Sequence, residues 1–300
     1  MWKDLADSID LSTITLLVSN KLSKIYSAKP LARKYDGHPE VIIKESKTGA
    51  TESKLHKKAS KRSPCVVEFL DSSINEGNRC IVMENCANDC LTALIRQREP
   101  EDRFWGTLTL KKYMHSLLTA VKAIHDIKIV HRDIKPDNIF VTQDLEVKLG
   151  DFGVSQFASP FSTLKGTFLY LPPELVCNNN SRIDLFKCDI WSLGKSFLEM
   201  CALTPCVDLH EYYDDEESLM RYVENVLREA NKEIVSLIKS MLRLEPRNRP
   251  SVDEALGMVQ FKDGDLPDLE ESTDNSGGFK RNKIPYMKSC LLYTSDAADE

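Results

Sequence analysis

The sequence has little of what several protein classes require. Its 300 residues carry 40 Lys and Arg against 46 Asp and Glu, a formal net charge of -6. It therefore lacks the basic excess with which a general nucleic-acid binder neutralises phosphates. Apolar runs such as residues 14–18 are far too short to cross a bilayer, and the chain does not open on the segments of a secretory signal. These absences disfavour a nucleic-acid partner and a membrane span.

The cysteines also lack an organised spacing. The nine cysteines form no paired C-x-x-C motifs, which disfavours a zinc site and a disulfide framework. We therefore expect reduced thiols and a cytoplasmic protein, with association with the nucleus or the cytoskeleton left open.

The C-terminal part lacks the periodicity of a folded segment. Residues 263–289 are first acidic and turn-forming and then basic, which is typical of a disordered, solvated tail. Residues 290–300 match one reading frame of a widely used transposase sequencing adapter. We interpret them as an assembly artefact and exclude them from reasoning about the fold; a genuine tail is the alternative.

Between the ends, the hydrophobic pattern changes from strands to helices after Cys90. Alternation and β-branched runs predict short strands at residues 41–43, 66–70 and 80–83. Apolar residues at three- and four-residue spacing predict helices at residues 110–124, 189–200, 218–230, 232–244 and 252–259. This order predicts an α+β, bilobal chain with a small β-rich lobe at about 12–86 and a larger, mainly helical lobe at about 87–262. A crevice between two lobes is the usual place for a ligand.

The stretch that carries most chemistry is His131-Arg132-Asp133-Ile134-Lys135-Pro136-Asp137-Asn138, followed later by Asp151-Phe152-Gly153. Aspartate and asparagine on loops bounded by apolar strands supply the oxygen donors that a hard divalent cation prefers. A lysine beside them supplies a point charge for phosphate oxygens. The pattern resembles the catalytic loop and the metal-binding turn of eukaryotic protein kinases.

The resemblance implies a protein-kinase fold over residues 12–262 and a serine/threonine kinase that transfers the γ-phosphate of ATP to protein hydroxyls with Mg²⁺. It implies that Asp133 accepts the proton of the acceptor hydroxyl and that Lys135 holds the γ-phosphate. It implies that Asn138 and Asp151 ligate magnesium. Lys135 in this position is the serine/threonine form of the loop.

For the nucleotide, the resemblance implies that Lys44 pairs with phosphates. The stretch from Glu84 to Cys86, after the gatekeeper Met83, is similar to the hinge that binds adenine. The segments at residues 138–141 and 147–153 are most similar to the NIMA-related kinases, with the sterile-twenty-like kinases second.

Further elements of the resemblance predict contacts around the catalytic loop. Thr167 is expected near Asp133 and Lys135, and Asp189 is expected to brace the backbone of the loop. Arg249 is expected to pair with Glu174.

A regulatory phosphate is expected on the activation segment. Thr163, with Ser162 as second choice, stands where many relatives carry a phosphate, and Arg132 would pair with it. An upstream kinase or autophosphorylation would supply that phosphate, and an unmodified hydroxyl is the alternative.

The small lobe departs from the family pattern in three ways. Residues 22–29 occupy the expected place of the glycine-rich phosphate loop but contain no glycine. Ile42 stands where alanine is usual and adds bulk beside the adenine position. Glu52, the candidate partner of Lys44, follows it so closely that either the intervening helix is short or the pair is absent.

Three functions therefore compete. The set of Asp133, Lys135, Asn138 and Asp151 favours an active protein kinase, because a scaffold needs neither a base nor metal ligands. The departures in the small lobe favour a pseudokinase scaffold with weak or no ATP turnover. A small-molecule phosphotransferase is disfavoured, because residues 166–174 resemble a segment that receives a peptide.

Overall fold

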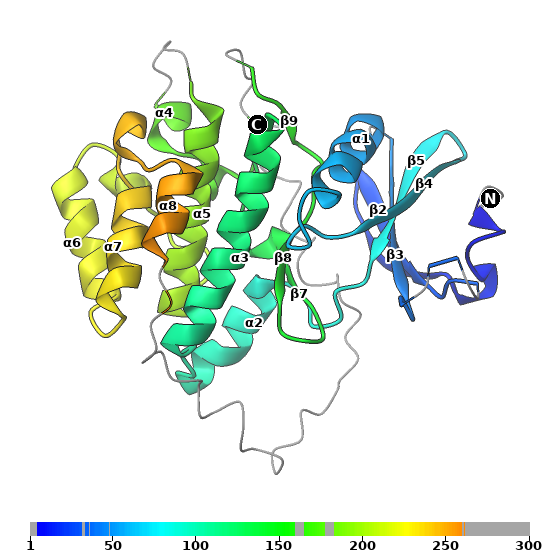
Figure 1. Cartoon of the computed structure of the whole chain (residues 1–300), viewed down its shortest axis with the longest axis horizontal. Coiled ribbons are helices and arrows are strands. Elements are labelled where there is room, and N and C mark those ends of the chain that lie inside the picture. The colour runs from blue at the N-terminus through cyan, green and yellow to red at the C-terminus, as the bar shows by residue number, and fades with distance from the viewer. Residues whose placement is uncertain are drawn as a thin grey trace.

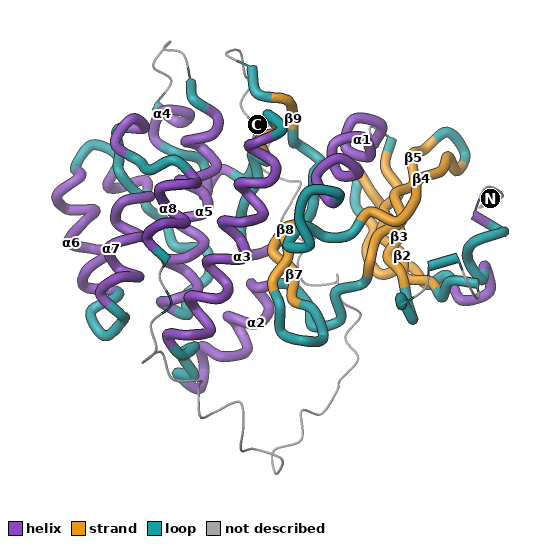
Figure 2. Tube along the Cα trace, in the orientation of Figure 1, coloured by secondary structure: helices purple, strands orange, loops and turns teal. Residues whose placement is uncertain are grey.

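The protein folds into two lobes of unequal size (Figure 1). The computed structural model describes residues 5–31, 34–35, 37–47, 49–159, 165–177, 183–259 and 261. The predicted phosphorylation sites Thr163 and Ser162, the tail at 263–289 and the suspected adapter segment at 290–300 lie outside the described residues. Strands dominate one lobe and helices the other, as the hydrophobic pattern predicts (Figure 2).

The small lobe is an antiparallel sheet with one long helix beside it. The strands follow the order β1-β2-β3-β5-β4. Their bounds are β1 Thr15–Ser19, β2 Ser23–Ala28, β3 Val41–Ser46, β4 Phe69–Asn75 and β5 Asn78–Glu84, and helix α1 spans Gly49–Ser60 and packs on β4 and β5.

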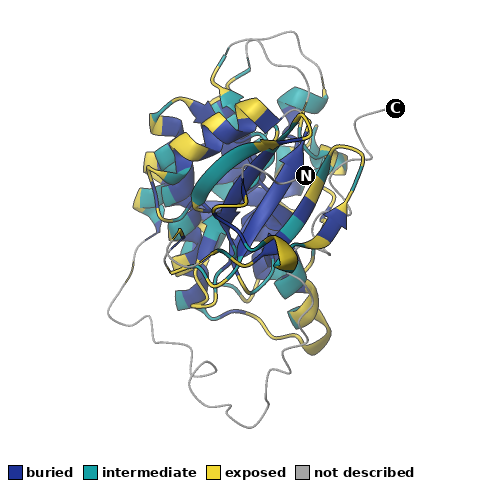
Figure 3. Ribbon diagram, turned by 90° about the vertical axis from the view of Figure 1, so that its right-hand side faces the viewer, coloured by how far each residue is buried: buried dark blue, intermediate teal, exposed yellow. Residues whose placement is uncertain are grey.

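The central strand β3 is buried along its whole length, because both faces of the sheet are covered. Ile42 points to a cluster shared with Ile25 and Met83, whereas Ile43 points to a cluster on the opposite face with Leu5 and Ile9. The sequence predicts that the small lobe begins at about residue 12. Because Leu5 and Ile9 belong to its core, the lobe extends to residues before that boundary. Figure 3 looks onto this lobe and shows the buried strands inside a more exposed covering.

The large lobe is built around helix α5, Leu185–Ala202, most of which is buried. The other helices are α2 Leu91–Arg98, α3 Thr107–Asp126, α4 Pro173–Val176, α6 Glu216–Val226, α7 Lys232–Met241 and α8 Val252–Met258. Short strands carry the loops between the lobes: β6 Ile129–Val130, β7 Ile139–Val141, β8 Val147–Leu149 and β9 Gln156–Phe157. Single 3-10 turns occur at Leu11–Thr13, Glu99–Glu101, Pro136–Asn138, Phe168–Tyr170, His210–Tyr212 and Pro246–Asn248.

The predicted position of the phosphate loop is wrong. Residues 23–28 form strand β2, which pairs in register with β3 from Ser23 opposite Ser46 to Ala28 opposite Val41. Buried Ile25 and Ala28 anchor this strand to the core. The turn between β1 and β2 lies earlier, at Asn20, Lys21 and Leu22. Within the described part of the chain, no helix is both long and apolar enough to span a membrane.

Candidate active site

Asp133 lies at the centre of a network of polar contacts in the loop that follows β6. Its Oδ1 accepts hydrogen bonds from the backbone N–H and the hydroxyl of Thr167, both at 2.8 Å. Its Oδ2 accepts from Asn138 Nδ2 at 3.0 Å and lies 3.3 Å from Lys135 Nζ. Lys135 Nζ also donates to the Thr167 hydroxyl. The predicted proximity of Thr167 to Asp133 and Lys135 is confirmed.

The backbone that carries Asp133 is held by a buried carboxylate. Arg132 has a φ of 71°, a left-handed conformation that costs free energy in a residue other than glycine. Asp189 on α5 accepts from the N–H groups of His131 and Arg132, both at 2.8 Å. Asp189 is 1% exposed. Its Oδ2, which accepts the N–H of His131, also lies 2.9 Å from His125 Nε2. The predicted bracing of the catalytic loop is confirmed.

Three charged side chains meet between the lobes. Lys44 Nζ lies 2.8 Å from Glu52 Oε1 and 2.7 Å from Asp151 Oδ1. Asp151 Oδ1 also accepts the N–H of Gly153 at 3.0 Å. The sequence left open whether Lys44 pairs with Glu52, and the structure shows that it does.

The close spacing of Lys44 and Glu52 works because the helix starts almost at the end of the strand. Strand β3 ends at Ser46 and α1 begins at Gly49, which puts Glu52 in the first turn, facing inward. A Cβ at position 49 would approach Arg79 Cβ and Ser46 Oγ to 3.0 Å, tighter than most such contacts. Glycine at this position therefore permits the tight connection.

The charges in this cluster shift one another's pKa values. Burial alone would lower the pKa of Lys44, but the carboxylates of Asp151 and Glu52 outweigh it and raise that pKa. Burial opposes ionisation of Asp151, yet Lys44 overrides burial and lowers its pKa to about 2. Burial raises the pKa of Glu52 despite the attraction of Lys44. Lys44 and Asp151 are thus the firmly ionised members of the cluster.

Aromatic rings pack beneath the charged cluster. Phe152 stacks on the ring of His56 with centroids 5.2 Å apart and meets His131 edge-on at 5.0 Å. His56 Nε2 lies 2.7 Å from the carbonyl of Val67. Burial lowers the pKa of His56 to about 4, so this ring is neutral near pH 7 and donates to that carbonyl. The stack links α1, which carries Glu52, to the catalytic loop.

The predicted hinge follows β5, with its side chains already engaged. The carboxylate of Glu84 lies 2.7 and 2.8 Å from Lys148 Nζ and accepts the N–H of Glu68 at 2.6 Å. Cys86 is buried in the cluster that contains Ile42 and Met83. The carboxylate of Glu84 is therefore engaged, its N–H donates to the Glu68 carbonyl at 3.1 Å, and Ile42 does occupy the apolar cluster next to the hinge.

The turn between β1 and β2 closes on its own side chain. Asn20 Oδ1 accepts hydrogen bonds from the N–H groups of Leu22 at 2.9 Å and Ser23 at 2.7 Å. The N–H of Asn20 in turn donates to the Ser23 carbonyl at 3.0 Å. A phosphate loop offers its backbone N–H groups to phosphate oxygens. In this turn, two of those groups are occupied by the Asn20 carboxamide.

Asn138 and Asp151 fit the way in which Mg²⁺ binds beside phosphates. Among the residues that the structure describes, no three His, Cys, Asp or Glu side chains form a metal-binding cluster. Mg²⁺ commonly takes one or two protein ligands and completes its shell with phosphate and water. Asn138 donates through Nδ2 to the Asp133 backbone carbonyl at 2.8 Å and to the Asp133 carboxylate at 3.0 Å, which leaves the Asn138 amide oxygen available as a metal ligand. With Asp151, it gives the two oxygen ligands that the sequence predicts for Mg²⁺.

A family model of the protein kinase domain matches residues 10–261. This chain belongs to the protein kinase family.

Several serine/threonine kinases are similar to this kinase domain over most of the chain. It is 29% identical over 289 residues to the cell cycle serine/threonine-protein kinase CDC5/MSD2 of Saccharomyces cerevisiae. The matched region covers 92% of this chain and 38% of that protein. It is 33% identical over 207 residues to serine/threonine-protein kinase Nek3 of Oryza sativa subsp. japonica (66% of this chain, 34% of that protein). It is 31% identical over 232 residues to Nek3 of Mus musculus (72% and 42%).

The predicted similarity to NIMA-related kinases is confirmed by the Nek relatives, and CDC5/MSD2 extends it to a further group of cell cycle kinases. The chain spans less than half of the length of each of these three relatives.

The sequence predicts some of the supporting contacts of this kinase and misses others. The predicted pair of Arg249 and Glu174 is formed, with two parallel contacts of 2.7 and 2.8 Å. The contact of Arg132 with the Gln156 carboxamide, at 2.7 Å, was not predicted, because Gln156 belongs to no motif. It shows that Arg132 is bound to a neutral acceptor in the described structure.

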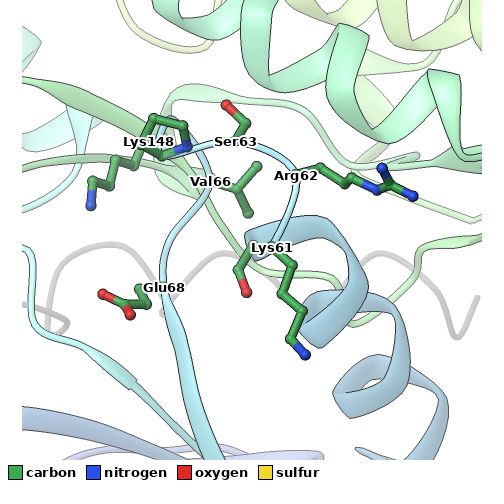
Figure 4. Close-up of a pocket in the computed structure, with 8 residues that line it drawn as sticks. Lys61, Arg62, Ser63, Val66, Glu68 and Lys148 are labelled. Carbon is green, nitrogen blue, oxygen red and sulfur yellow. The ribbon is translucent and has the colours of Figure 1, made fainter.

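A hollow of about 360 Å³ opens beside the C-terminal end of α1; it is lined by Ser60, Lys61, Arg62, Ser63, Pro64, Val66, Glu68 and Lys148. Figure 4 shows that the labelled charged side chains point in different directions rather than toward one centre. Lys148 is already bound to Glu84. The hollow therefore lacks the convergent charges of a ligand site.

Proposed function

We propose that this kinase domain is an active serine/threonine protein kinase that transfers the γ-phosphate of ATP to Ser or Thr hydroxyls of protein substrates in the presence of Mg²⁺. The proposal rests on the observation that two sets of side chains, one for the nucleotide and one for the acceptor hydroxyl, are each held in place by direct contacts. Lys44, Glu52 and Asp151 are joined by contacts of 2.7 and 2.8 Å, while Asp133 is oriented by Thr167 and Asn138.

Asp133 is the proposed general base. Its two oxygens are held from three sides, so the carboxylate needs no reorganisation to accept a proton from an acceptor hydroxyl. Thr167 contacts Asp133 from the segment expected to receive the peptide. An acceptor hydroxyl bound there would lie beside the base.

Lys44 and Lys135 are the proposed cations for the phosphates. Lys44 is fixed by two carboxylates, so its charge is held in one geometry. Lys135 is 1% exposed and lies between Asp133 and Thr167. Mg²⁺, held by Asn138 and Asp151, would neutralise charge on the phosphate oxygens.

The pseudokinase alternative loses one of its three supports. The short segment after Lys44 does not prevent the ion pair with Glu52, since α1 begins close to the end of β3. Ile42 and the glycine-free turn remain as features that would weaken the binding of ATP without removing the residues of transfer.

Regulation by a phosphate on Thr163 is a further proposal. Arg132 binds Gln156 and is partly buried, so a phosphate that reached it would replace a neutral partner by a doubly charged one. Phosphorylated protein should be more active than phosphatase-treated protein, and equal activities would contradict this regulation.

The function is tested by ATP binding and phosphate transfer with the same protein. Mg-ATP is expected to raise the midpoint of thermal unfolding, and radiolabel from γ-labelled ATP is expected to appear on casein. No thermal shift and no label above background would reject the proposal and favour a scaffold.

A further inference from the structure

A lysine is buried in the centre of the large lobe. Lys195 lies on α5 with its side chain 0% exposed, and Glu199, one helical turn further on, is equally buried. Burial lowers the pKa of Lys195 and raises the pKa of Glu199 to about 7. A buried pair of this kind costs stability unless hydrogen bonds satisfy it, so its contacts indicate what it does.

The polar contacts of the pair lead to one segment. Lys195 Nζ donates to the backbone carbonyl of Leu169 and lies 4.2 Å from the centre of the Tyr170 ring. Glu199 accepts the Tyr170 hydroxyl at 2.7 Å and the N–H of Val207 at 3.0 Å. The pair thus holds both the backbone and the side chain of the turn at Phe168–Tyr170.

Three successive carbonyls of this segment are held by side chains. The Leu169 carbonyl is bound by Lys195, the Tyr170 carbonyl by the Ser192 hydroxyl at 2.9 Å, and the Leu171 carbonyl by the Tyr213 hydroxyl. Because two of these side chains belong to α5, the contacts fix the backbone of residues 169–171 relative to that helix. Ser192, like Lys195, lies on that helix.

The same segment begins at the catalytic base. Thr167, which contacts Asp133 by two hydrogen bonds, immediately precedes the turn. Phe168 is 48% exposed and stacks on His210 with ring centroids 4.4 Å apart. The segment therefore joins the base at one end to an exposed aromatic platform, while its carbonyls face the buried side chains of the lobe.

We propose that Lys195 is a positioning residue for the acceptor substrate, which fixes the segment at residues 167–171 beside Asp133 through the Leu169 carbonyl. The proposal rests on the proposed kinase function, because the segment has an acceptor to receive only in a protein kinase. Lys195 touches neither nucleotide nor acceptor and acts through the backbone that it holds.

The experiment compares wild type with Lys195→Met/Glu199→Gln, in which the lysine is replaced by an apolar chain of similar length and no unpaired carboxylate remains. Leu198→Met, a buried substitution on the same helix, is the matched control. Hydrogen exchange is measured at the amides of Tyr170 and Leu171, which donate to Thr167 and Phe168. The Michaelis constants for casein and for ATP are measured in parallel.

In the double variant, the two amides are expected to exchange about tenfold faster, and the Michaelis constant for casein is expected to rise about tenfold with that for ATP unchanged. The control should match wild type. A folded double variant with wild-type exchange and an unchanged Michaelis constant for casein would overturn the proposal.

Two further outcomes are separable. If the double variant does not fold, the hydrogen-exchange rates of the wild type are used instead. Amides of Tyr170 and Leu171 that exchange as slowly as those of α5 support the proposal. Amides that exchange as fast as in an unfolded peptide overturn it. If wild type transfers no phosphate, the proposed function fails, while the exchange measurements still decide whether Lys195 fixes the segment.

Discussion

Lys44 and Glu52 form an ion pair of 2.8 Å across one of the shortest connections in the small lobe. The pair forms because β3 leads almost directly into α1, and Gly49 allows the helix to start against Arg79. A feature that weakens the resemblance in the sequence is therefore compatible with an ordered nucleotide site.

Replacing Glu52 should separate catalysis from folding. In Glu52→Gln, the ammonium of Lys44 keeps Asp151 but loses its second carboxylate, so phosphate transfer is expected to fall at least about tenfold. Lys54→Gln, on the exposed face of the same helix, should retain wild-type transfer. Initial rates of casein labelling measure both. Equal rates for Glu52→Gln and wild type would show that the pair is not needed.

Replacing Asn20 should strengthen nucleotide binding. Asn20→Gly frees the N–H groups of Leu22 and Ser23, and Mg-ATP affinity is expected to rise about threefold to tenfold. Asn20→Asp keeps an acceptor oxygen and adds negative charge near the phosphates, so it should bind more weakly than wild type. Titration calorimetry with Mg-ATP measures the three affinities. Weaker binding by Asn20→Gly would show that the turn does not compete with phosphate.

His56 should make the fold sensitive to acid. Its pKa is about 4 in the folded protein against an ordinary value of 6.5, so its contribution is present in full above pH 6.5 and is lost as pH falls toward 4. The loss amounts to about 3 kcal/mol. Glu199, with its raised pKa, acts in the opposite direction over part of this range. The difference between wild type and His56→Leu therefore isolates the effect of His56.

The measurement is urea unfolding at several pH values between 6.5 and 4. His56→Leu should lose less stability than wild type on acidification. Parallel pH curves for the two proteins would contradict a depressed pKa for His56.

Breaking the pair of Arg249 and Glu174 should destabilise the large lobe. Arg249 is 1% exposed and also donates to the carbonyls of Arg243, Lys187 and Leu244. Arg249→Met leaves Glu174 without its charged partner, which is expected to cost about 3 to 5 kcal/mol. Arg247→Met removes only an exposed pair with Glu245 and should change stability by less than about 1 kcal/mol. Chemical unfolding of both variants tests this contrast, and equal losses would refute it.

The sequence predicts the large lobe well because its functional residues are neighbours along the chain. Asp133, Lys135 and Asn138 share one loop, so their residue types and spacing already define the site. The partners Asp189 and Arg249 stand in similarly recognisable stretches, and their predicted contacts are formed.

The small lobe is harder to predict, because its landmarks are tertiary. Without glycine, nothing in the local sequence distinguishes a phosphate turn from a strand, and pairing with β3 decides that residues 23–28 are a strand. The pairing of Lys44 with Glu52 depends on where the helix starts. Lys195 gives no signal at all in the sequence, since its role depends on contacts with a segment some 26 positions away.

Phosphate transfer by wild type and Asp133→Asn tests the central claim most directly. With γ-labelled Mg-ATP and casein, wild type is expected to label the acceptor, and Asp133→Asn should lose at least about a hundredfold in rate while it keeps the thermal stabilisation by Mg-ATP. Wild-type labelling no faster than that of Asp133→Asn would contradict the account.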